Sequence, residues 1–156
     1  MTYTINSNLK EFVEVDPAKL EKFLAQDSEH LLMKLGFTAT KVGKLFNVNP
    51  LYIVAHAILE SAWGTSNLAK LKNNLFGYGA SDDAPFEKAF KFPTQECCVV
   101  FVMYKVVTNY LTPAGKFWGD EPSLWGMNKM YASDKGWADK ICKIMNNIDK
   151  FLTKEG

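Results

Sequence analysis

The distribution of hydrophobic residues predicts a mostly helical chain in which one helix is buried on nearly all sides. Over residues 50–63 (PLYIVAHAILESAW), apolar and aromatic side chains cover almost the whole circumference of a helical wheel. Asn49 can cap this helix, Pro50 can open it, and Gly64 suits the left-handed position that closes it. We therefore expect this helix to form the centre of the fold.

Further helices are predicted on both sides of the central one. Asp16 and Pro17 resemble a helix start, and the spacing of the apolar residues after them favours one or two amphipathic helices. The pattern also predicts a short helix over 38–46, a buried helix over 94–111 and a final helix from Trp137. The β-branched residues within 94–111 leave a strand as the alternative there.

The helical period disappears over residues 73–93 (NNLFGYGASDDAPFEKAFKFP), where aromatic residues alternate with glycine, aspartate and proline. This composition is typical of turns and of a short hairpin. The sequence therefore predicts an α+β domain that is predominantly α-helical and two-lobed. A small irregular or β-hairpin lobe follows the buried central helix, and a cleft is expected where that helix ends.

Length and composition limit the classes of protein to consider. A chain of 156 residues, 47% hydrophobic and 22% charged, fits a single domain over 1–156. No apolar run reaches the roughly 20 residues of a membrane span, so we expect no membrane insertion. The formal net charge is +1 and the basic residues are scattered, which argues against nucleic acid as a partner. We expect a monomer.

Cysteine and histidine usage gives no sign of a metal or a disulfide framework. Cys97 and Cys98 are adjacent and Cys142 is distant, so we expect three reduced core residues. His30 and His56 have no companion ligands at metal spacing, so each is interpreted as an interior or surface residue. We predict no metal and no cofactor.

One carboxylate, Glu60, lies in the apolar central helix, four residues before Gly64. Desolvation disfavours the charged form, so we expect its pKa to be raised, as general-acid catalysis on a glycosidic oxygen requires. The alternative is a structural role, in which Glu60 reaches solvent at the helix end or pairs with Lys70 or Lys72.

Glycoside hydrolysis usually needs a second group, commonly a carboxylate. The lobe after the central helix offers Asp82, Asp83 and Glu87, although each also fits an ordinary turn or a solvated charge. Aromatic side chains, on which the apolar faces of sugars stack, gather in the same part of the chain, and half or more of them should be core residues. They are Phe76, Tyr78, Phe86, Phe90, Phe92, Trp118, Trp125, Tyr131 and Trp137.

Two sequence blocks carry a family resemblance. AHAILESAWGTSNLAKLKNNLFGYGASDDAPF and GMNKMYASDKGWADKICKIM resemble the bacterial endo-β-N-acetylglucosaminidases of glycoside hydrolase family 73, with their A-x-x-E-S-x-W-G and YA-D elements. The likeness covers about residues 38–150 and leaves 1–37 as an N-terminal helical extension. It implies a lysozyme-like fold and hydrolysis of the β-1,4 bond on the reducing side of N-acetylglucosamine in peptidoglycan.

The resemblance also implies roles for individual residues. The family's general acid falls on Glu60, and the tyrosine of the YA-D element falls on Tyr131, in the active-site cleft. An A-x-D-x-x-P element points to Asp82 as the second catalytic group, with Glu87 in reserve. In a substrate-assisted mechanism, Asp82 or Tyr131 would polarise the acetamido group, whereas in an inverting one Asp82 would activate water.

We expect four further side chains to bind the substrate, which is the glycan strand of bacterial peptidoglycan. They are Phe76, Tyr78, Glu87 and Trp137. A muramidase or lytic transglycosylase acting on the same polymer is the nearest alternative. A non-catalytic glycan-binding or virion module is the alternative from another class.

The N-terminal residues lack the basic segment and apolar run of a secretory signal. We therefore expect a phage-encoded lysin that reaches the wall from the host cytoplasm or in the virion, or else a fragment of an exported autolysin.

Overall fold

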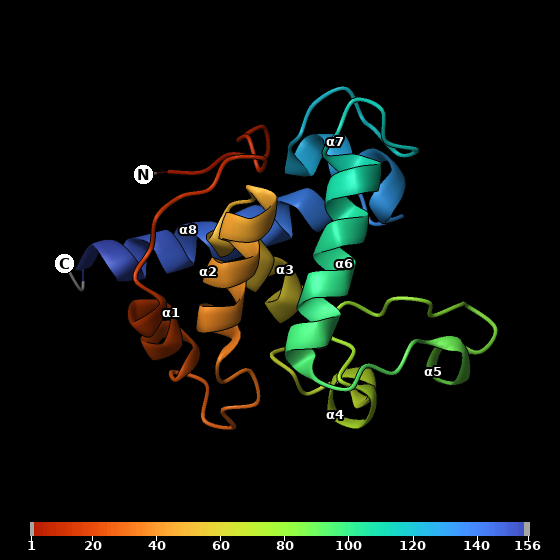
Figure 1. Ribbon diagram of the computed structural model, residues 1–156, viewed down its shortest axis with the longest axis horizontal. Helices are drawn as coiled ribbons and strands as arrows, with labels where there is room; N and C mark the ends of the chain where they lie inside the picture. Colours follow the sequence, from red (N-terminus) through yellow and green to blue (C-terminus); the bar gives the residue numbers. More distant parts are fainter. Residues whose placement is uncertain (1, 155–156) are drawn as a thin grey trace.

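A computed structural model describes residues 2–154, and helices that cross at steep angles form the body of the molecule (Figure 1). In that range the helices are α1 (Pro17–Leu24), α2 (Leu35–Phe46), α3 (Pro50–Ser61), α4 (Asn67–Lys72), α5 (Pro85–Lys88), α6 (Gln95–Tyr110), α7 (Leu124–Tyr131) and α8 (Trp137–Lys154). None of them is long and apolar enough to cross a membrane.

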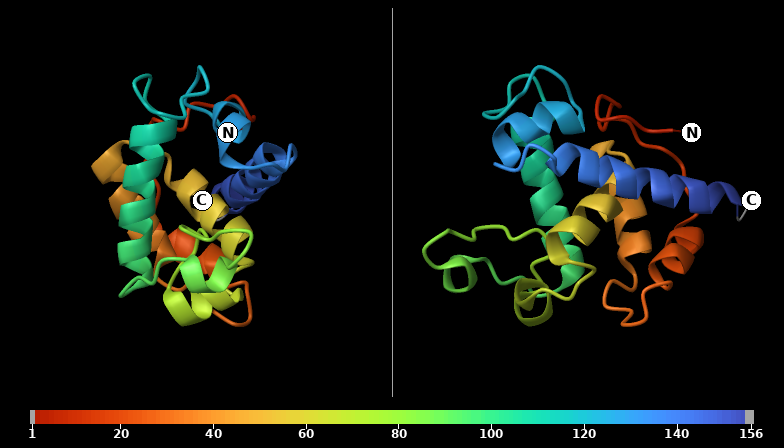
Figure 2. Two further views of the ribbon diagram at one scale, coloured as in Figure 1. Left: turned by 90° about the vertical axis from the view of Figure 1, so that its right-hand side faces the viewer. Right: turned by 180° about the vertical axis from the view of Figure 1, so that it is seen from behind.

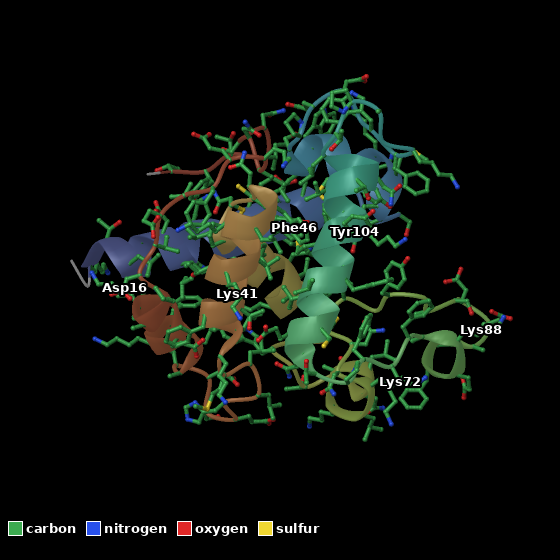
Figure 3. The ribbon with its side chains drawn as sticks, viewed as in Figure 1. Asp16, Lys41, Phe46, Lys72, Lys88 and Tyr104 are labelled. Carbon is green, nitrogen blue, oxygen red and sulfur yellow. The ribbon has the colours of Figure 1, made fainter. Side chains whose placement is uncertain are left out.

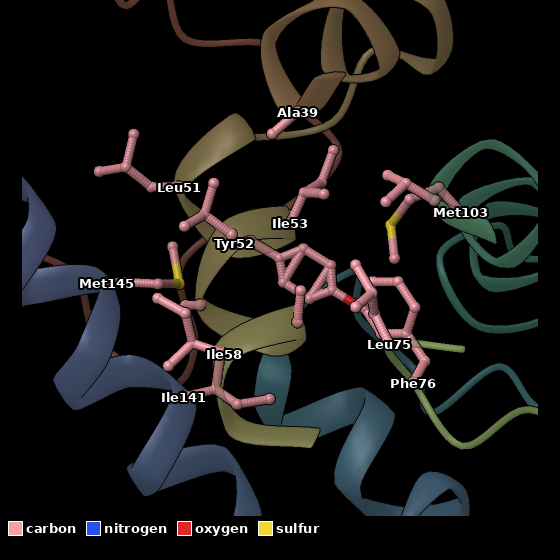
Figure 4. Close-up of a cluster of buried hydrophobic side chains, with 14 of the residues drawn as sticks. Ala39, Leu51, Tyr52, Ile53, Ile58, Leu75, Phe76, Met103, Ile141 and Met145 are labelled. Carbon is pink, nitrogen blue, oxygen red and sulfur yellow. The ribbon is translucent and has the colours of Figure 1, made fainter. Parts of the chain in front are cut away.

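Helix α3 is the buried central helix that the sequence predicts. The Asn49 side chain accepts a hydrogen bond from the Leu51 backbone N–H, and Pro50 occupies the first turn. Helices α2 and α8 pack against it. In Figure 4, Ile58 lies toward α8, and Tyr52 lies toward the segment after α4. The core therefore surrounds α3.

The end of α3 differs from the prediction. The helix stops at Ser61, and Ala62, Trp63 and Gly64 all adopt left-handed conformations, with φ of 49°, 58° and 80°. Glycine adopts this conformation readily, and the N–H groups of Ala62 and Trp63 donate to the carbonyls of Leu59 and Ile58. The Ser61 hydroxyl donates to the carbonyl of Ala57 and accepts from the N–H of Gly64 at 2.9 Å.

The first predicted helical region contains one helix, α1, followed by turns. Helix α2 begins at Leu35, three residues earlier than expected, because the Glu21 carboxylate accepts hydrogen bonds from the backbone N–H groups of Lys34 and Gly36. The N-terminal segment before α1 has no helix in the described residues, but Leu9 is fully buried and its carbonyl accepts from the N–H of Asn49.

The later helices bear out the pattern with one addition. Helix α6 shows that 94–111 is helical and not a strand, and α8 begins at Trp137 as predicted. Helix α7 is the addition, because the sequence pattern predicts no helix over Leu124–Tyr131. Ser123 starts it, because its hydroxyl accepts a hydrogen bond from the N–H of Gly126 at 3.1 Å.

The predicted β-hairpin is wrong for the part of the chain that the structure describes, which contains no strand. Tyr78 and Phe90 do come together, through one backbone hydrogen bond of 3.0 Å from the N–H of Phe90. The buried Asn74 side chain makes the other links, to both backbone groups of Tyr78 and to the carbonyl of Phe90. A side chain thus takes the place of a strand ladder, and the expected α+β fold is helical with an irregular lobe.

The cysteines are free thiols, as predicted. Cys98 and Cys142 are buried, but Cys97 is exposed, so the expectation that all three lie in the core is wrong for Cys97. Within residues 2–154, no group of three histidine, cysteine, aspartate or glutamate side chains is placed to hold a metal ion.

Candidate active site

A cleft of about 760 Å³ opens at the C-terminal end of α3. Its walls come from α3, the segment that follows α4, α6, and the junction between α7 and α8. The lining residues are Leu59, Glu60, Phe76, Gly77, Tyr78, Gly79, Ala80, Val102, Lys105, Val106, Asn109, Tyr110, Phe117, Tyr131, Ala132, Ser133, Asp134, Trp137 and Lys140. The two family-like blocks, far apart in the sequence, therefore meet at one cleft.

Glu60 lies in the last turn of α3, and its side chain is 28% exposed. The indole N–H of Trp137 donates a 2.8 Å hydrogen bond to Oε1 of this carboxylate, and His56 Nε2 lies 3.6 Å from the same oxygen. The alternative pairing with Lys72 is not made, because its Nζ donates to backbone carbonyls of the lobe, including that of Ala89. Glu60 is thus held in the cleft by α3 and α8.

The expectation of a raised Glu60 pKa is wrong. Burial does raise the pKa of this carboxyl, but the adjacent His56 imidazole and the Trp137 N–H lower it by more, so it lies below its ordinary value. The apolar pattern of the central helix shows the desolvation. It does not show the indole donor, which comes from a helix 77 residues away along the chain.

The wall behind Glu60 is aromatic. Tyr131 stacks on Trp137, with ring centroids 4.9 Å apart, and makes an edge contact with Tyr110 at 5.1 Å. Burial and the nearby Glu60 raise the pKa of Tyr131, so its hydroxyl is neutral and able to donate a hydrogen bond. Two of the predicted site residues, Glu60 and Tyr131, therefore share the cleft.

Phe76 and Tyr78, predicted to bind substrate, also line the cleft with Gly77 and Gly79, although the Phe76 ring is buried. Both glycines have left-handed φ angles, of 68° and 79°. A side chain at Gly79 would also collide with the ring of Phe90, which lies 2.6 Å from the position of its Cβ. The glycines of the NLFGYG stretch therefore allow the backbone turn that places these two rings at the cleft.

The predicted second carboxylates do not line this cleft. Asp82 and Glu87 are exposed, and Ala80 is the last residue of their loop on the cleft wall. Asp83 is bound by Lys88 Nζ and by the Ser81 hydroxyl, both at 2.7 Å, which fits the turn role considered for it. From behind, the loop projects away from the helical body (right-hand view in Figure 2). The structure thus does not bring Asp82 or Glu87 to Glu60.

Three cleft residues gave no signal in the sequence, whereas Asp134 is the aspartate of the YA-D element. Lys105, Asn109 and Tyr110 lie on α6, which the apolar pattern marks only as buried. Asp134 lies just before α8, and its carboxylate accepts hydrogen bonds from Lys140 Nζ at 2.6 Å and the Gly136 N–H at 2.9 Å. The hydrogen bond from Lys140 lowers the pKa of Asp134.

His56, for which the sequence left an interior or a surface position open, is an interior residue with no exposed surface. Its distance of four residues from Glu60 is the one signal that could have placed it beside the carboxylate, because residues four apart share a helix face. Its Nδ1 lies 2.9 Å from the hydroxyl of Tyr52.

A second hollow, of about 820 Å³, lies between α2 and α6 and is mostly apolar. Phe46 and Tyr104, labelled next to each other in Figure 3, both line it, with ring centroids 6.3 Å apart. None of the predicted site residues lines it. The predicted chemistry is therefore concentrated in the cleft at the end of α3.

Comparison with known proteins identifies the family. The family model described as "Glucosaminidase: Mannosyl-glycoprotein endo-beta-N-acetylglucosaminidase" matches residues 36–150. A protein of Streptococcus pneumoniae serotype 4, provisionally named endo-beta-N-acetylglucosaminidase, is 34% identical over 147 residues, which cover 93% of this chain and 22% of that protein. The chain therefore spans about a fifth of this relative's length.

Solved structures of Staphylococcus aureus autolysin E have the same fold. The complex of autolysin E with the muropeptide NAM-L-ALA-D-iGLU superposes with a TM-score of 0.69 at 26% identity, covering 97% of this chain and 73% of that one. A catalytic mutant of autolysin E bound to the disaccharide NAG-NAM gives 0.72 at 24% identity, over 100% of this chain and 75% of that chain. At 24% identity, the likeness to this mutant structure shows a shared fold and nothing more.

Proposed function

Because this chain belongs to the glucosaminidase family, we propose that it hydrolyses the β-1,4 bond on the reducing side of N-acetylglucosamine in bacterial peptidoglycan. The observation that carries the proposal is the position of Glu60, a hydrogen-bonded carboxylate in the wall of the cleft. The muropeptide bound by autolysin E is a fragment of the same polymer, which supports peptidoglycan as the substrate.

Glu60 is the proposed general acid. Its low pKa in the open cleft means that it is ionised at neutral pH, so it must gain a proton before it can protonate the glycosidic oxygen. A sugar that fills the cleft expels water, and the loss of water raises the pKa of a carboxyl group. Proton uptake by Glu60 therefore accompanies substrate binding in this proposal.

Tyr131 is the proposed partner of Glu60. In a substrate-assisted reaction, the acetamido oxygen of the substrate attacks the anomeric carbon, and the enzyme needs only a donor or acceptor that polarises the acetamido group. Tyr131, whose hydroxyl is neutral, lines the cleft with Glu60, whereas Asp82 is exposed on the loop. These positions favour the substrate-assisted reaction over an inverting one in which Asp82 activates water.

Aromatic side chains would hold the sugars. Tyr78 and Tyr131, which line the cleft and are half-buried, offer ring surface to the apolar faces of the glycan. Phe76 and Trp137 are buried, so their role in substrate binding stays a prediction. Glu87 is exposed outside the cleft, so its role in binding stays a prediction, as does the origin of the chain from a phage lysin or an exported autolysin.

The test is mass spectrometry of purified peptidoglycan digested with the protein and then reduced with borohydride. We expect new reduced N-acetylglucosamine ends. Reduced or anhydro N-acetylmuramic acid ends would instead indicate a muramidase or a lytic transglycosylase. The absence of any new ends would favour a glycan-binding module.

A further inference from the structure

His56 is a buried titratable side chain that the proposed mechanism does not yet use. Its ring has no exposed surface and makes edge contacts with three aromatic rings from three other parts of the chain. The centroid distances are 4.9 Å to Phe76, 5.0 Å to Tyr131 and 5.3 Å to Trp137. The imidazole is thus fixed from several sides directly behind Glu60.

The two nitrogen atoms of His56 have different surroundings. Nδ1 lies 2.9 Å from the Tyr52 hydroxyl. Nε2 is buried without a hydrogen-bond partner among residues 2–154, and it lies 3.6 Å from Oε1 of Glu60. A buried polar atom without a partner costs free energy, so its position facing the carboxylate requires a reason.

Electrostatics decides which nitrogen carries the proton. A neutral imidazole has one N–H group and one lone pair. A lone pair on Nε2 would be repelled by the Glu60 carboxylate, whereas an N–H there is attracted to it. We therefore assign the N–H to Nε2, and the Tyr52 hydroxyl donates to the lone pair of Nδ1.

We propose that His56 is a positioning residue for Glu60: the Tyr52 hydroxyl fixes its Nε2–H tautomer, and this N–H closes onto Oε1 of Glu60 as the substrate fills the cleft. Catalytic hydrogen bonds are often long before substrate binds and then shorten, so the 3.6 Å separation fits a contact that tightens in the complex.

This arrangement makes the two oxygens of Glu60 different. The Trp137 indole and His56 Nε2 both face Oε1, whereas Oε2 receives no hydrogen bond from any residue in the described part of the chain. The acid proton therefore belongs on Oε2. When Oε2 transfers that proton to the glycosidic oxygen, the carboxylate charge that remains is stabilised at Oε1 by two N–H donors.

The titratable groups around His56 determine how its replacement can change the pH dependence of activity. The titratable side chains in contact with the ring are Tyr52 and Glu60 on its own helix and Tyr131 on α7, while Phe76 and Trp137 do not titrate. Burial raises the pKa of both tyrosines, so they stay neutral across the range in which a glycosidase is assayed. A change of the pH profile in that range therefore does not come from these two tyrosines.

The first test observes the tautomer by ¹⁵N NMR of the imidazole groups in the wild-type protein. The chain has two histidines, and the exposed His30 can be removed to assign the signals. His30→Asn suits this purpose because His30 has a φ of 52°, a conformation that asparagine tolerates. We expect a proton on Nε2 of His56 and none on Nδ1. An Nδ1–H form would overturn the proposal, whatever the activity of the protein.

The second test compares two substitutions on soluble glycan strands and rests on the proposed function. His56→Leu removes the N–H donor, and His56→Gln can return one near the position of Nε2. We expect kcat to fall by about 10²-fold for His56→Leu, the cost of a slightly misplaced catalytic group, with KM changed less than about threefold. His56→Gln should recover to within about tenfold of wild type. The basic limb of the kcat profile should move to higher pH in His56→Leu, because Glu60 has lost a donor that favours its ionised form.

Wild-type protein without activity would contradict the proposed function and not the assignment of His56. An active wild type with His56→Leu within about threefold of its kcat would overturn the positioning role, as would equal losses in the two variants. Thermal unfolding and circular dichroism check that each variant folds. If His56→Leu does not fold, the tautomer of His56 in the wild type and the kcat of His56→Gln decide whether His56 positions Glu60.

Discussion

At the scale of the residue, Glu60 combines features that seldom occur together. It is the one carboxylate of an otherwise apolar helix, and its environment favours the charged form through groups that face a single oxygen. A surface carboxylate at a helix end needs no such surroundings. A carboxylate that must first gain a proton and then release it benefits from a place where its charge is stabilised.

Replacing Glu60 by glutamine should separate catalysis from folding and binding. The amide oxygen can still accept the Trp137 N–H, so we expect Glu60→Gln to fold and to bind glycan. It has no acid proton, so lytic activity should fall by about 10²- to 10⁴-fold, the usual contribution of a general acid. Turbidity loss of cell walls measures the activity, and pull-down on insoluble peptidoglycan measures binding. A variant that keeps more than a few per cent of wild-type lysis would exclude Glu60 as the acid.

At the scale of the element, the irregular lobe depends on polar side chains that replace regular structure. Asn74 joins the two arms of the lobe, and Lys72 Nζ donates to the carbonyls of Phe86, Glu87 and Ala89 (Lys72 is labelled in Figure 3). These bonds fix both ends of the loop that carries Asp82. The loop itself is exposed, which leaves it accessible to a bound glycan strand.

Substitutions in this loop test which carboxylate assists Glu60. We expect Asp82→Asn to reduce turnover by less than Glu60→Gln, because Asp82 is exposed outside the cleft and Tyr131 is the proposed polarising group. Glu87→Gln on α5 is the matched control and should have the smaller effect. Initial rates of reducing-end formation measure all three variants. Greater damage from Glu87→Gln than from Asp82→Asn would show that the assignment of Asp82 is wrong.

At the scale of the whole molecule, the sequence predicts what depends on local pattern and misses what depends on distant partners. The apolar circumference of α3 and its Asn49 and Pro50 start are local features, and the structure confirms them. The indole donor to Glu60 comes from the far end of the chain, so the sign of the Glu60 pKa shift was predicted wrongly. The prediction of a β-hairpin is wrong for a similar reason, because the Asn74 side chain makes the hydrogen bonds that a pair of strands would have made.

The pKa of Glu60 also predicts how the stability of the whole domain depends on pH. Its pKa is lower in the folded protein than its ordinary value, so the unfolded chain binds the proton more tightly. The stabilisation from this group is therefore complete above the unfolded pKa of about 4.3 and is lost as pH falls through the folded pKa. Glutamine at this position does not titrate.

We therefore expect the difference in unfolding free energy between wild type and Glu60→Gln to favour wild type most near pH 7 and to shrink as pH falls below about 5. Urea unfolding of both proteins at several pH values measures this difference. Asp83 and Asp134, whose pKa values are also lowered, are present in both proteins, so their contributions cancel. If the unfolding free energy of the wild type instead increased relative to that of Glu60→Gln as pH falls, the pKa of Glu60 would be raised in the folded protein. In that case burial would outweigh His56 and Trp137, and the carboxyl would already hold its proton before the substrate arrives.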